Sequence, residues 1–417
     1  MGFGREIVLA ALYGTSAEIE VFRIAFGLPM VLADGAAVSV VSVLVPFLVA
    51  SRAGMSAPRV GAAGTTMAAM ACALGLIGVL TMPWQATLLG PGFTGPARDD
   101  LILLGRICWA GFVLVTLSLP LRGVLAARGA VWPNAGLQLM RSGGFVGALL
   151  LGLLAWGTGL WALALAALGS GAGVLAIHIA ALGGRGRRML GAGIARCWQV
   201  DRTLAAALGS VMVAQILLAG GRLLDRAVAS GLEQGTVAAL EFSYGLLMAM
   251  AALMGTTASL FVAPYVTRAL REGQGIARGA WLRVAALTGA AAVGGLLTAA
   301  MALPLVQAVF GYGAFDADDA ALTAGLFRIH ALGLAPVVAA LVLTQFVLIL
   351  GGPRTILWIA GGKLALKAAA LFALLSLGLG ADALTLSLIV AETGMALVLA
   401  GYLVRQRASF APAREGV

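Results

Sequence analysis

Long apolar stretches separated by short polar segments follow one another along almost the whole chain. A helix needs roughly 20 mostly apolar residues to cross the hydrocarbon core of a bilayer. The stretches that reach this length lie at about 21–50, 61–83, 101–127, 132–156, 159–183, 202–228, 237–264, 280–310, 321–350, 353–380 and 382–404. The apolar segment from Phe3 to Tyr13 is about half as long and predicts a short first helix. Since the alternating pattern of a membrane barrel is absent, we expect an all-α polytopic membrane protein with about 12 transmembrane helices.

The composition excludes most soluble classes of protein. Of the 417 residues, 11% are charged and 61% are hydrophobic, whereas soluble globular proteins carry roughly 25% charged residues. These values exclude a soluble enzyme, a disordered chain and a nucleic-acid-binding protein, although the formal net charge is +10. The three cysteines and two histidines are scattered along the chain. We therefore expect no disulfide framework, no metal site and no cofactor.

The charged residues of the loops alternate in sign along the chain. If the N-terminus is cytoplasmic, the cytoplasmic loops and the tail hold Arg52, Arg59, Arg128, Arg185, Arg187, Arg188, Arg196, Arg268, Arg271, Arg278, Arg354, Arg405, Arg407 and Arg414. The intervening loops are mainly acidic, and Arg98 is the plain exception. Because cytoplasmic loops carry an excess of Lys and Arg, this pattern predicts that both termini are cytoplasmic. The basic loops would also contact anionic membrane lipids.

Two outer loops resemble each other and indicate an internal repeat. Phe93 precedes Arg106 by thirteen residues and Phe315 precedes Arg328 by thirteen, with a pair of aspartates between them in each case. Repeats with an even number of crossings have the same orientation, and two such lobes around a central cavity form the usual frame of alternating access. We expect a six-helix N-terminal lobe at 1–183, a basic cytoplasmic linker at 184–201, a six-helix C-terminal lobe at 202–404 and a cytoplasmic tail at 405–417.

Ionisable residues inside the apolar stretches are the candidate functional residues. Each costs roughly 2.5–3.5 kcal/mol at a helix centre, so such groups usually face protein or water. Guanidinium groups match phosphate oxygens and stay charged, so the candidate ligands of an anionic headgroup are Arg5, Arg23, Arg141, Arg222 and Arg328. The candidates for gating or charge coupling are Glu6, Glu20, Asp225 and Glu241.

Simpler roles for these charges remain open at this stage. Those near helix ends, such as Arg5, Glu6, Glu20, Asp225 and Arg226, could extend to the membrane surface. Others could form buried ion pairs. Arg222 and Asp225 stand three residues apart on one helix face, so they could neutralise each other.

The sequence contains no signature of catalysis. It lacks HExxH, GxSxG and carboxylates with metal-ligand spacing on one helix. The acidic residues Asp316, Asp318 and Asp319 fit a solvated helix start better than a cation site, and Asp316 or Asp318 suits the N-cap.

Several motifs, in the same order along nearly the whole chain, resemble the MurJ/MviN family of lipid II flippases. They are Gly2–Glu6 (GFGRE), Glu20–Pro29 (EVFRIAFGLP), Leu89–Phe93 (LGPGF), Gly123–Gly129 (GVLAARG), Leu223–Leu232 (LLDRAVASGL), Ala239–Tyr244 (ALEFSY) and Phe310–Phe315 (FGYGAF). The family belongs to the MATE/polysaccharide-exporter superfamily. By motif match, Arg5 takes the place of the family's first-helix arginine, and Glu20 that of an acidic residue at the start of the second helix.

The chain also departs from this family, as a divergent and short member would. After Leu28-Pro29 the family commonly has N-L-L-R-R, whereas this chain has Met30 to Asp34 without arginine. The arginine of the family's Y-x-x-R-L motif is Gly245 here. Twelve crossings are expected where the family often has fourteen. Arg23, Arg222 and Arg328 could compensate for the two missing substrate arginines.

The resemblance implies a transporter and not an enzyme, in the bacterial cytoplasmic (inner) membrane. The leading hypothesis is an alternating-access flippase for a polyprenyl-diphosphate-linked saccharide, either lipid II or an exopolysaccharide precursor. The alternatives are an integral-membrane glycan enzyme acting on the same lipid carrier, and a transport-inactive scaffold in a polysaccharide assembly complex. We expect a monomer, and a proton, a cation or the membrane potential could drive the cycle.

Overall fold

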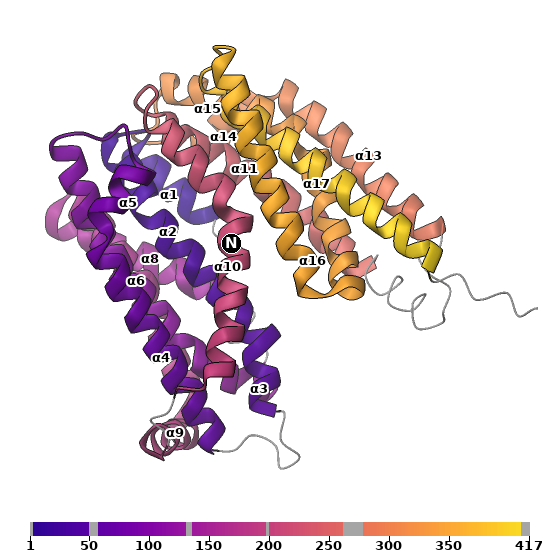
Figure 1. Cartoon of the computed structure of the whole chain (residues 1–417). Helices are drawn as coiled ribbons and strands as arrows, with labels where there is room; N and C mark the ends of the chain where they lie inside the picture. Colours follow the sequence, from indigo (N-terminus) through magenta and orange to yellow (C-terminus); the bar gives the residue numbers. More distant parts are fainter. Residues whose placement is uncertain (1–2, 50–56, 131–135, 197–199, 262–277, 410–417) are drawn as a thin grey trace, which may run out of the picture. The chain divides into compact units, whose positions relative to one another are not determined.

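The computed structural model describes residues 3–49, 57–130, 136–196, 200–261 and 278–409 (Figure 1). Within these ranges the chain forms helices and no strands, which confirms the all-α prediction. The helices form two compact units, Met1–Gly235 and Thr236–Val417, which are called the first and the second unit below.

The first unit contains the helices from α1 to α10. Their bounds are α1 Phe3–Tyr13, α2 Ala17–Ser39, the π-helix η1 Val40–Leu44, α3 Val45–Val49, α4 Ala57–Leu80, α5 Met82–Leu89, α6 Pro96–Ala127, α8 Leu137–Trp156, α9 Leu160–Arg196 and α10 Arg202–Ala229. Gly14, with φ of +54°, forms the turn between α1 and α2. Proline stands in the first turn of α5 and of α6, where its missing N–H costs no helical hydrogen bond.

Helices α8 and α9 pack closely because glycines line their contact. A Cβ atom on Gly144 would lie 2.5 Å from the carbonyl oxygen of Gly169, and one on Gly173 would lie 3.1 Å from Gly144 Cα. Small residues let helix backbones approach each other in this way inside membranes. This packing holds α8 in place, and α8 carries Arg141 and Phe145.

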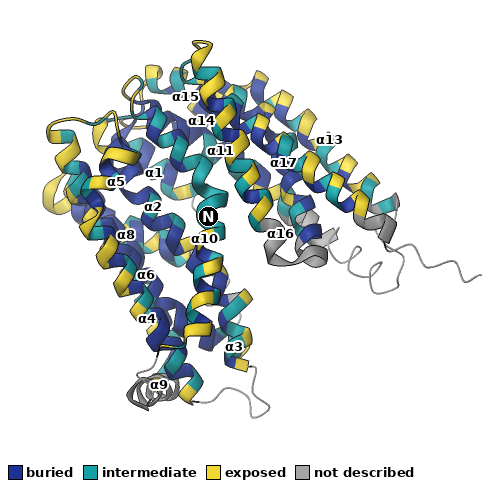
Figure 2. Cartoon of the chain, viewed as in Figure 1, coloured by how far each residue is buried: buried dark blue, intermediate teal, exposed yellow. Residues whose placement is uncertain are grey.

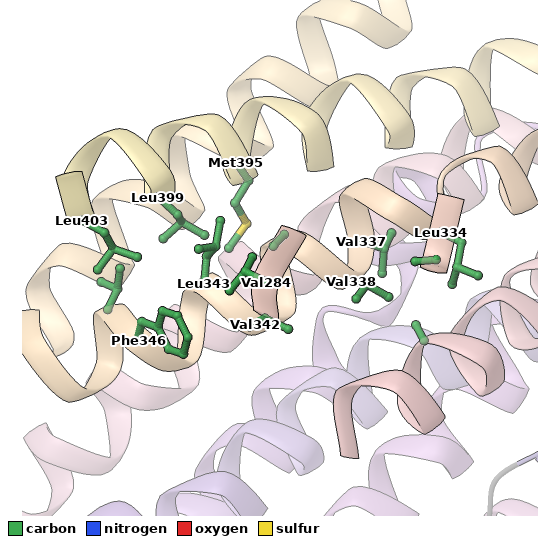
Figure 3. Packing of buried hydrophobic residues seen from close by; sticks show 14 of the residues in the cluster. Val284, Leu334, Val337, Val338, Val342, Leu343, Phe346, Met395, Leu399 and Leu403 are labelled. Atoms are coloured by element: carbon green, nitrogen blue, oxygen red, sulfur yellow. The ribbon is translucent and has the colours of Figure 1, made fainter. Parts of the chain in front are cut away.

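The second unit contains α11 Thr236–Phe261, α13 Arg278–Ala300, α14 Ala302–Phe310, α15 Ala317–Leu332, α16 Leu334–Ser376 and α17 Asp382–Ser409. Figure 3 shows part of its core, in which Leu343 and Phe346 of α16 pack with Leu399 and Leu403 of α17. Asp316 caps α15, because its Oδ1 accepts a 2.8 Å hydrogen bond from the Asp319 N–H. This confirms the predicted N-cap.

Ten helices of the described part are long and apolar enough to cross a membrane, and a bent pair brings the number to eleven. That pair is α15 with the first part of α16, which meet at an angle of 51°. Each span overlaps one of the predicted apolar stretches, so the polytopic prediction is confirmed. The stretch 280–310 differs in detail, since it contains two helices, α13 and α14.

The order of elements in the two units supports the internal repeat. In the first unit α5 begins at Met82 and α6 at Pro96, and in the second unit α14 begins at Ala302 and α15 at Ala317. A long helix thus leads into a short one and then into the helix that carries Arg106 or Arg328. The predicted lobe boundary at 184–201 stays a prediction, because compactness alone does not show which helices move together. By packing, α10 belongs with the first unit.

Many large apolar side chains lie on the outside of both units (Figure 2). Trp84 of α5, Leu154 of α8 and Trp358 of α16 are 82%, 87% and 84% exposed. A soluble protein would bury such side chains, whereas hydrocarbon tails solvate them as well as a protein core does. The exposed apolar surface is therefore the lipid-facing surface of a membrane protein.

Candidate functional site

The Glu6 carboxylate lies between two arginine side chains in the first unit. Its Oε1 accepts hydrogen bonds from Arg5 Nε at 3.2 Å and from Arg5 Nη2 at 2.7 Å. Its Oε2 forms an ion pair with Nη2 of Arg23 on α2. Glu6 and Arg23 are only 7% and 6% exposed. Two guanidinium groups thus converge on one buried carboxylate and leave a net positive charge.

Aromatic rings surround the partly exposed Arg5 guanidinium. Its Cζ atom lies 5.6 Å from the ring centre of Phe26 and 5.2 Å from that of Phe145 on α8. Phe22 stacks on Phe26 with ring centres 5.0 Å apart. A cation over an aromatic face gains roughly 0.5–2 kcal/mol. These contacts hold the Arg5 guanidinium over apolar rings, with Glu6 on one side.

A second ion pair lies three turns further along α2. Arg141 Nη1 of α8 lies 2.6 Å from Asp34 Oδ1, and Arg141 also contacts the sulfur atom of Met30. Arg141 is 8% exposed, whereas the Asp34 side chain is 52% exposed. Residues 23, 27, 30 and 34 recur every three or four positions, so they share one face of α2. Sequence analysis did not select Asp34, although its carboxylate stands inside an apolar stretch.

Helix α10 approaches this region of α2 at two glycines. A Cβ on Gly27 would overlap the guanidinium of Arg226, and one on Gly35 would lie 2.9 Å from Cβ of Gln215. Arg226 therefore lies against α2, one turn from Arg23. Arg226 of α10, for which the sequence favoured a position at the membrane surface, is half-buried and lies against α2. The contact of Gly27 with Arg226 depends on the packing of α10 against α2, so the sequence alone did not indicate it.

The structure brings three of the five predicted arginines, Arg5, Arg23 and Arg141, onto or against α2. Arg222 is half-buried on α10, one turn before Arg226. Arg328 belongs to the second unit and is exposed on α15, and its part in a shared site stays a prediction.

All four predicted gating carboxylates are buried. Glu6, Glu20, Asp225 and Glu241 are between 4% and 7% exposed. Their burial favours partners inside the protein over an extension to the membrane surface. Buried carboxylates in a membrane protein need cationic or hydrogen-bonding neighbours, and for Glu6 these are the two arginines of α1 and α2.

Among the described residues, no three His, Cys, Asp or Glu side chains form a group that could hold a metal ion. The arrangement around α2 instead suits the binding of an anion, because guanidinium groups donate several hydrogen bonds to phosphate oxygens without changing their own charge.

A family model described as "Lipid II flippase MurJ" matches residues 9–415. The chain belongs to the MurJ family. MurJ proteins are transporters and not enzymes, so membership makes this chain a membrane flippase or transporter and excludes the glycan-enzyme alternative. A lipid-linked saccharide is the class of substrate that the family implies. Among curated protein sequences there is no match.

Solved structures show the same fold as this MurJ-family chain. Lipid II flippase MurJ in an inward closed conformation is 14% identical with a TM-score of 0.78, over 98% of this chain and 87% of that one. An inward-facing multidrug resistance MATE family transporter of the MOP superfamily is also 14% identical with a TM-score of 0.78, over 99% and 95%. An outward-facing MATE family transporter is 16% identical with a TM-score of 0.62, over 99% and 92%.

Proposed function

We propose that this MurJ-family protein moves a polyprenyl-diphosphate-linked saccharide across the bacterial cytoplasmic membrane by alternating access. The diphosphate binds to Arg5, Arg23 and Arg141 of the first unit, with Arg222 and Arg328 as further ligands, and Glu6, Glu20, Asp225 and Glu241 take part in gating or charge coupling. The observation that carries this proposal is the position of Glu6, whose two oxygens each meet a different guanidinium group. Two oxygens of a phosphate group present similar acceptors.

The charge around α2 favours an anionic headgroup over a cationic drug. Arg5 and Arg23 share one carboxylate, Arg226 lies one turn further on, and Arg141 is paired with Asp34. The meeting of Arg5 and Arg23 on the two oxygens of one carboxylate supports a ligand that presents anionic oxygens to the same two groups. Each charge-assisted hydrogen bond to such a ligand contributes roughly 1.5–3 kcal/mol.

Arg141 bears on the identity of the saccharide. The family commonly has two arginines where this chain has Ala33 and Asp34, and Arg141 reaches that place from α8 and pairs with Asp34. A guanidinium group is therefore present there, but it comes from another helix and has a carboxylate beside it. This rearrangement supports a substrate other than lipid II, such as an exopolysaccharide precursor with the same diphosphate and a different sugar.

The test is flipping by the purified protein in liposomes. A fluorescently labelled lipid II and a labelled diphosphate-linked precursor without peptide are supplied separately, and access to an external reductant reports the leaflet. We expect the wild type to flip at least one of them, and Arg5→Gln or Arg23→Gln to slow it about tenfold or more, which corresponds to the loss of one charge-assisted bond.

Arg106→Gln is the matched control, because Arg106 is exposed on α6 and should leave the rate unchanged. Equal rates for the wild type, Arg5→Gln and Arg23→Gln would show that the arginines do not bind the headgroup. A wild type that flips neither lipid, and that does not rescue a bacterium depleted of its own flippase, would support the transport-inactive scaffold.

A further inference from the structure

The Glu6 carboxylate lies where two guanidinium groups converge, which is also where the diphosphate is proposed to bind. Its Oε1 accepts hydrogen bonds from Arg5 Nε at 3.2 Å and from Arg5 Nη2 at 2.7 Å, and its Oε2 forms an ion pair with Arg23 Nη2. The Glu6 side chain is 10% exposed and that of Arg5 is 19% exposed. A ligand that reaches Arg5 therefore arrives directly beside a buried carboxylate.

The charges of this site balance only when Glu6 is protonated in the complex. Arg5, Arg23 and an ionised Glu6 together carry one positive charge, since arginine stays protonated in proteins. A diphosphate that is esterified at both ends carries two negative charges. The complex would keep one uncompensated negative charge with an ionised Glu6, and it is neutral when Glu6 binds one proton. Buried charges without a partner are unfavourable, so the neutral complex is favoured.

The diphosphate also takes up the donors on which the ionised carboxylate depends. Arg5 and Arg23 supply the contacts of Glu6 given above. Phosphate oxygens that accept hydrogen bonds from these guanidinium groups weaken their attraction for Glu6. A buried carboxylate that loses opposite charge, or that has a second anion beside it, binds a proton more readily. The protonated carboxyl group can then donate a hydrogen bond to a phosphate oxygen.

Among the neighbouring ionisable groups, one other carboxylate is a rival for this proton. Helix α1 packs against α2 and α8. Asp34 is paired with Arg141, and Glu18 is exposed. Glu20 is 4% exposed and stands three residues before Arg23, so it needs a separate test. The ionisable groups of the three helices are Arg5, Glu6 and Tyr13 on α1, Glu18, Glu20, Arg23 and Asp34 on α2, and Arg141 on α8.

We propose that Glu6 binds a proton when the diphosphate binds to Arg5 and Arg23, so that the proton and the substrate strengthen each other's binding. This inference rests on the proposed function and describes how its binding site is regulated. Because the linkage is reciprocal, the affinity for the diphosphate is highest at acidic pH and falls as the pH rises through the range in which Glu6 of the complex loses its proton. The ionised carboxylate then competes for both arginines, which favours release of the diphosphate.

Calorimetry on the purified full-length protein measures both the proton and the affinity. The probe is a water-soluble N-acetylglucosamine joined through a diphosphate to a short prenyl chain. Its phosphates stay ionised near neutral pH and add no proton change of their own. Titrations in two buffers with different heats of ionisation give the number of protons taken up per ligand. For the wild type we expect uptake that approaches one proton, and a dissociation constant that rises up to tenfold per pH unit.

Glu6→Gln imitates the protonated carboxyl group and cannot take up a proton. We expect this variant to bind the probe without proton uptake, and at every pH about as tightly as the wild type does at acidic pH. The matched control is Glu18→Gln, because Glu18 is exposed on α2, and it should keep the uptake of the wild type. If Glu6→Gln does not fold, Glu20→Gln serves in its place, since uptake that remains in Glu20→Gln excludes the rival carboxylate.

The possible failures of this experiment differ from one another. A wild type that binds the probe without proton uptake, and equally well at every pH, would overturn the role of Glu6 and leave the proposed function standing. Uptake that persists in Glu6→Gln and is lost in Glu20→Gln would place the proton on Glu20 and overturn the inference. A wild type that does not bind the probe would overturn the arginine site of the proposed function together with the inference.

Discussion

Arg141 on α8 forms an ion pair with Asp34 on α2, at 2.6 Å between Nη1 and Oδ1. The pair links the two helices that also carry Phe145 and Phe26, between which Arg5 is held. It places a guanidinium group beside the segment of α2 in which the family commonly has arginine of its own.

Exchange of these two charges tests whether the guanidinium group must come from α8 or can also come from α2. Asp34→Arg combined with Arg141→Asp keeps the ion pair and moves the guanidinium to α2. We expect the double variant to retain most of the flipping rate, whereas Arg141→Gln alone lowers it about tenfold. If the double variant is as slow as Arg141→Gln, the guanidinium is required on α8 itself.

If Arg5 and Arg23 bind the diphosphate as proposed, Glu6 competes with it for these two arginines. Glu6→Gln removes the competing charge and nearly keeps the size of the side chain. We expect inorganic pyrophosphate to bind the purified variant about tenfold more tightly, measured by calorimetry, while flipping slows because release is no longer assisted. The control is Glu18→Gln, because Glu18 is exposed in the first turn of α2. Weaker binding in Glu6→Gln would mean that Glu6 only positions the arginines.

Gly27 leaves room for the Arg226 guanidinium where α10 approaches α2. In Gly27→Ala the added methyl group overlaps this guanidinium, which ends a flexible side chain and can shift, so the cost lies at the low end of the roughly 1–3 kcal/mol typical of overpacking. We expect a lower melting temperature in detergent. Arg226→Ala should relieve the clash, so that Gly27→Ala lowers the melting temperature less in that background. Gly147→Ala, on α8 with no atom near the new Cβ, should not be destabilising.

The N-cap of α15 should contribute to the stability of the second unit. Asp316→Ala removes the 2.8 Å hydrogen bond to the Asp319 N–H, and the loss of such a cap costs about 0.5–2 kcal/mol. Asp318→Ala, in the same turn, removes a similar charge without removing the cap. We expect Asp316→Ala to lower the melting temperature more than Asp318→Ala does. An equal decrease in both variants would mean that only the lost charge matters.

The helices could be predicted from the sequence because hydrophobic length is a local property. Every span of the described part overlaps a predicted apolar stretch, and the cap at Asp316 follows from residue types at one helix start. The candidate site could be predicted only in part. Arg5, Glu6 and Arg23 stood out as charges in apolar stretches, but nothing in their spacing showed that one carboxylate would meet both arginines.

Pairings between residues distant in sequence escaped prediction for a physical reason. Arg141 was predicted as a site residue, but its pairing with Asp34, 107 positions away, was not, and neither was the contact of His330 with Ser243, 87 positions away. Such pairs form only when packing brings two helices together. A single sequence does not show which residues on different helices lie close in space. Sequence analysis assigned His330 no role as a metal ligand, and its buried position beside Ser243 was not foreseen.

The sequence by itself determined the membrane class, the helical spans and the family motifs, since these depend on composition and on residues close together in the chain. Only the tertiary structure decided which buried charges are partners. A charge in an apolar helix is stabilised by partner groups on other helices. Which groups become partners depends on how the helices pack, as in the contact of Gly27 with Arg226.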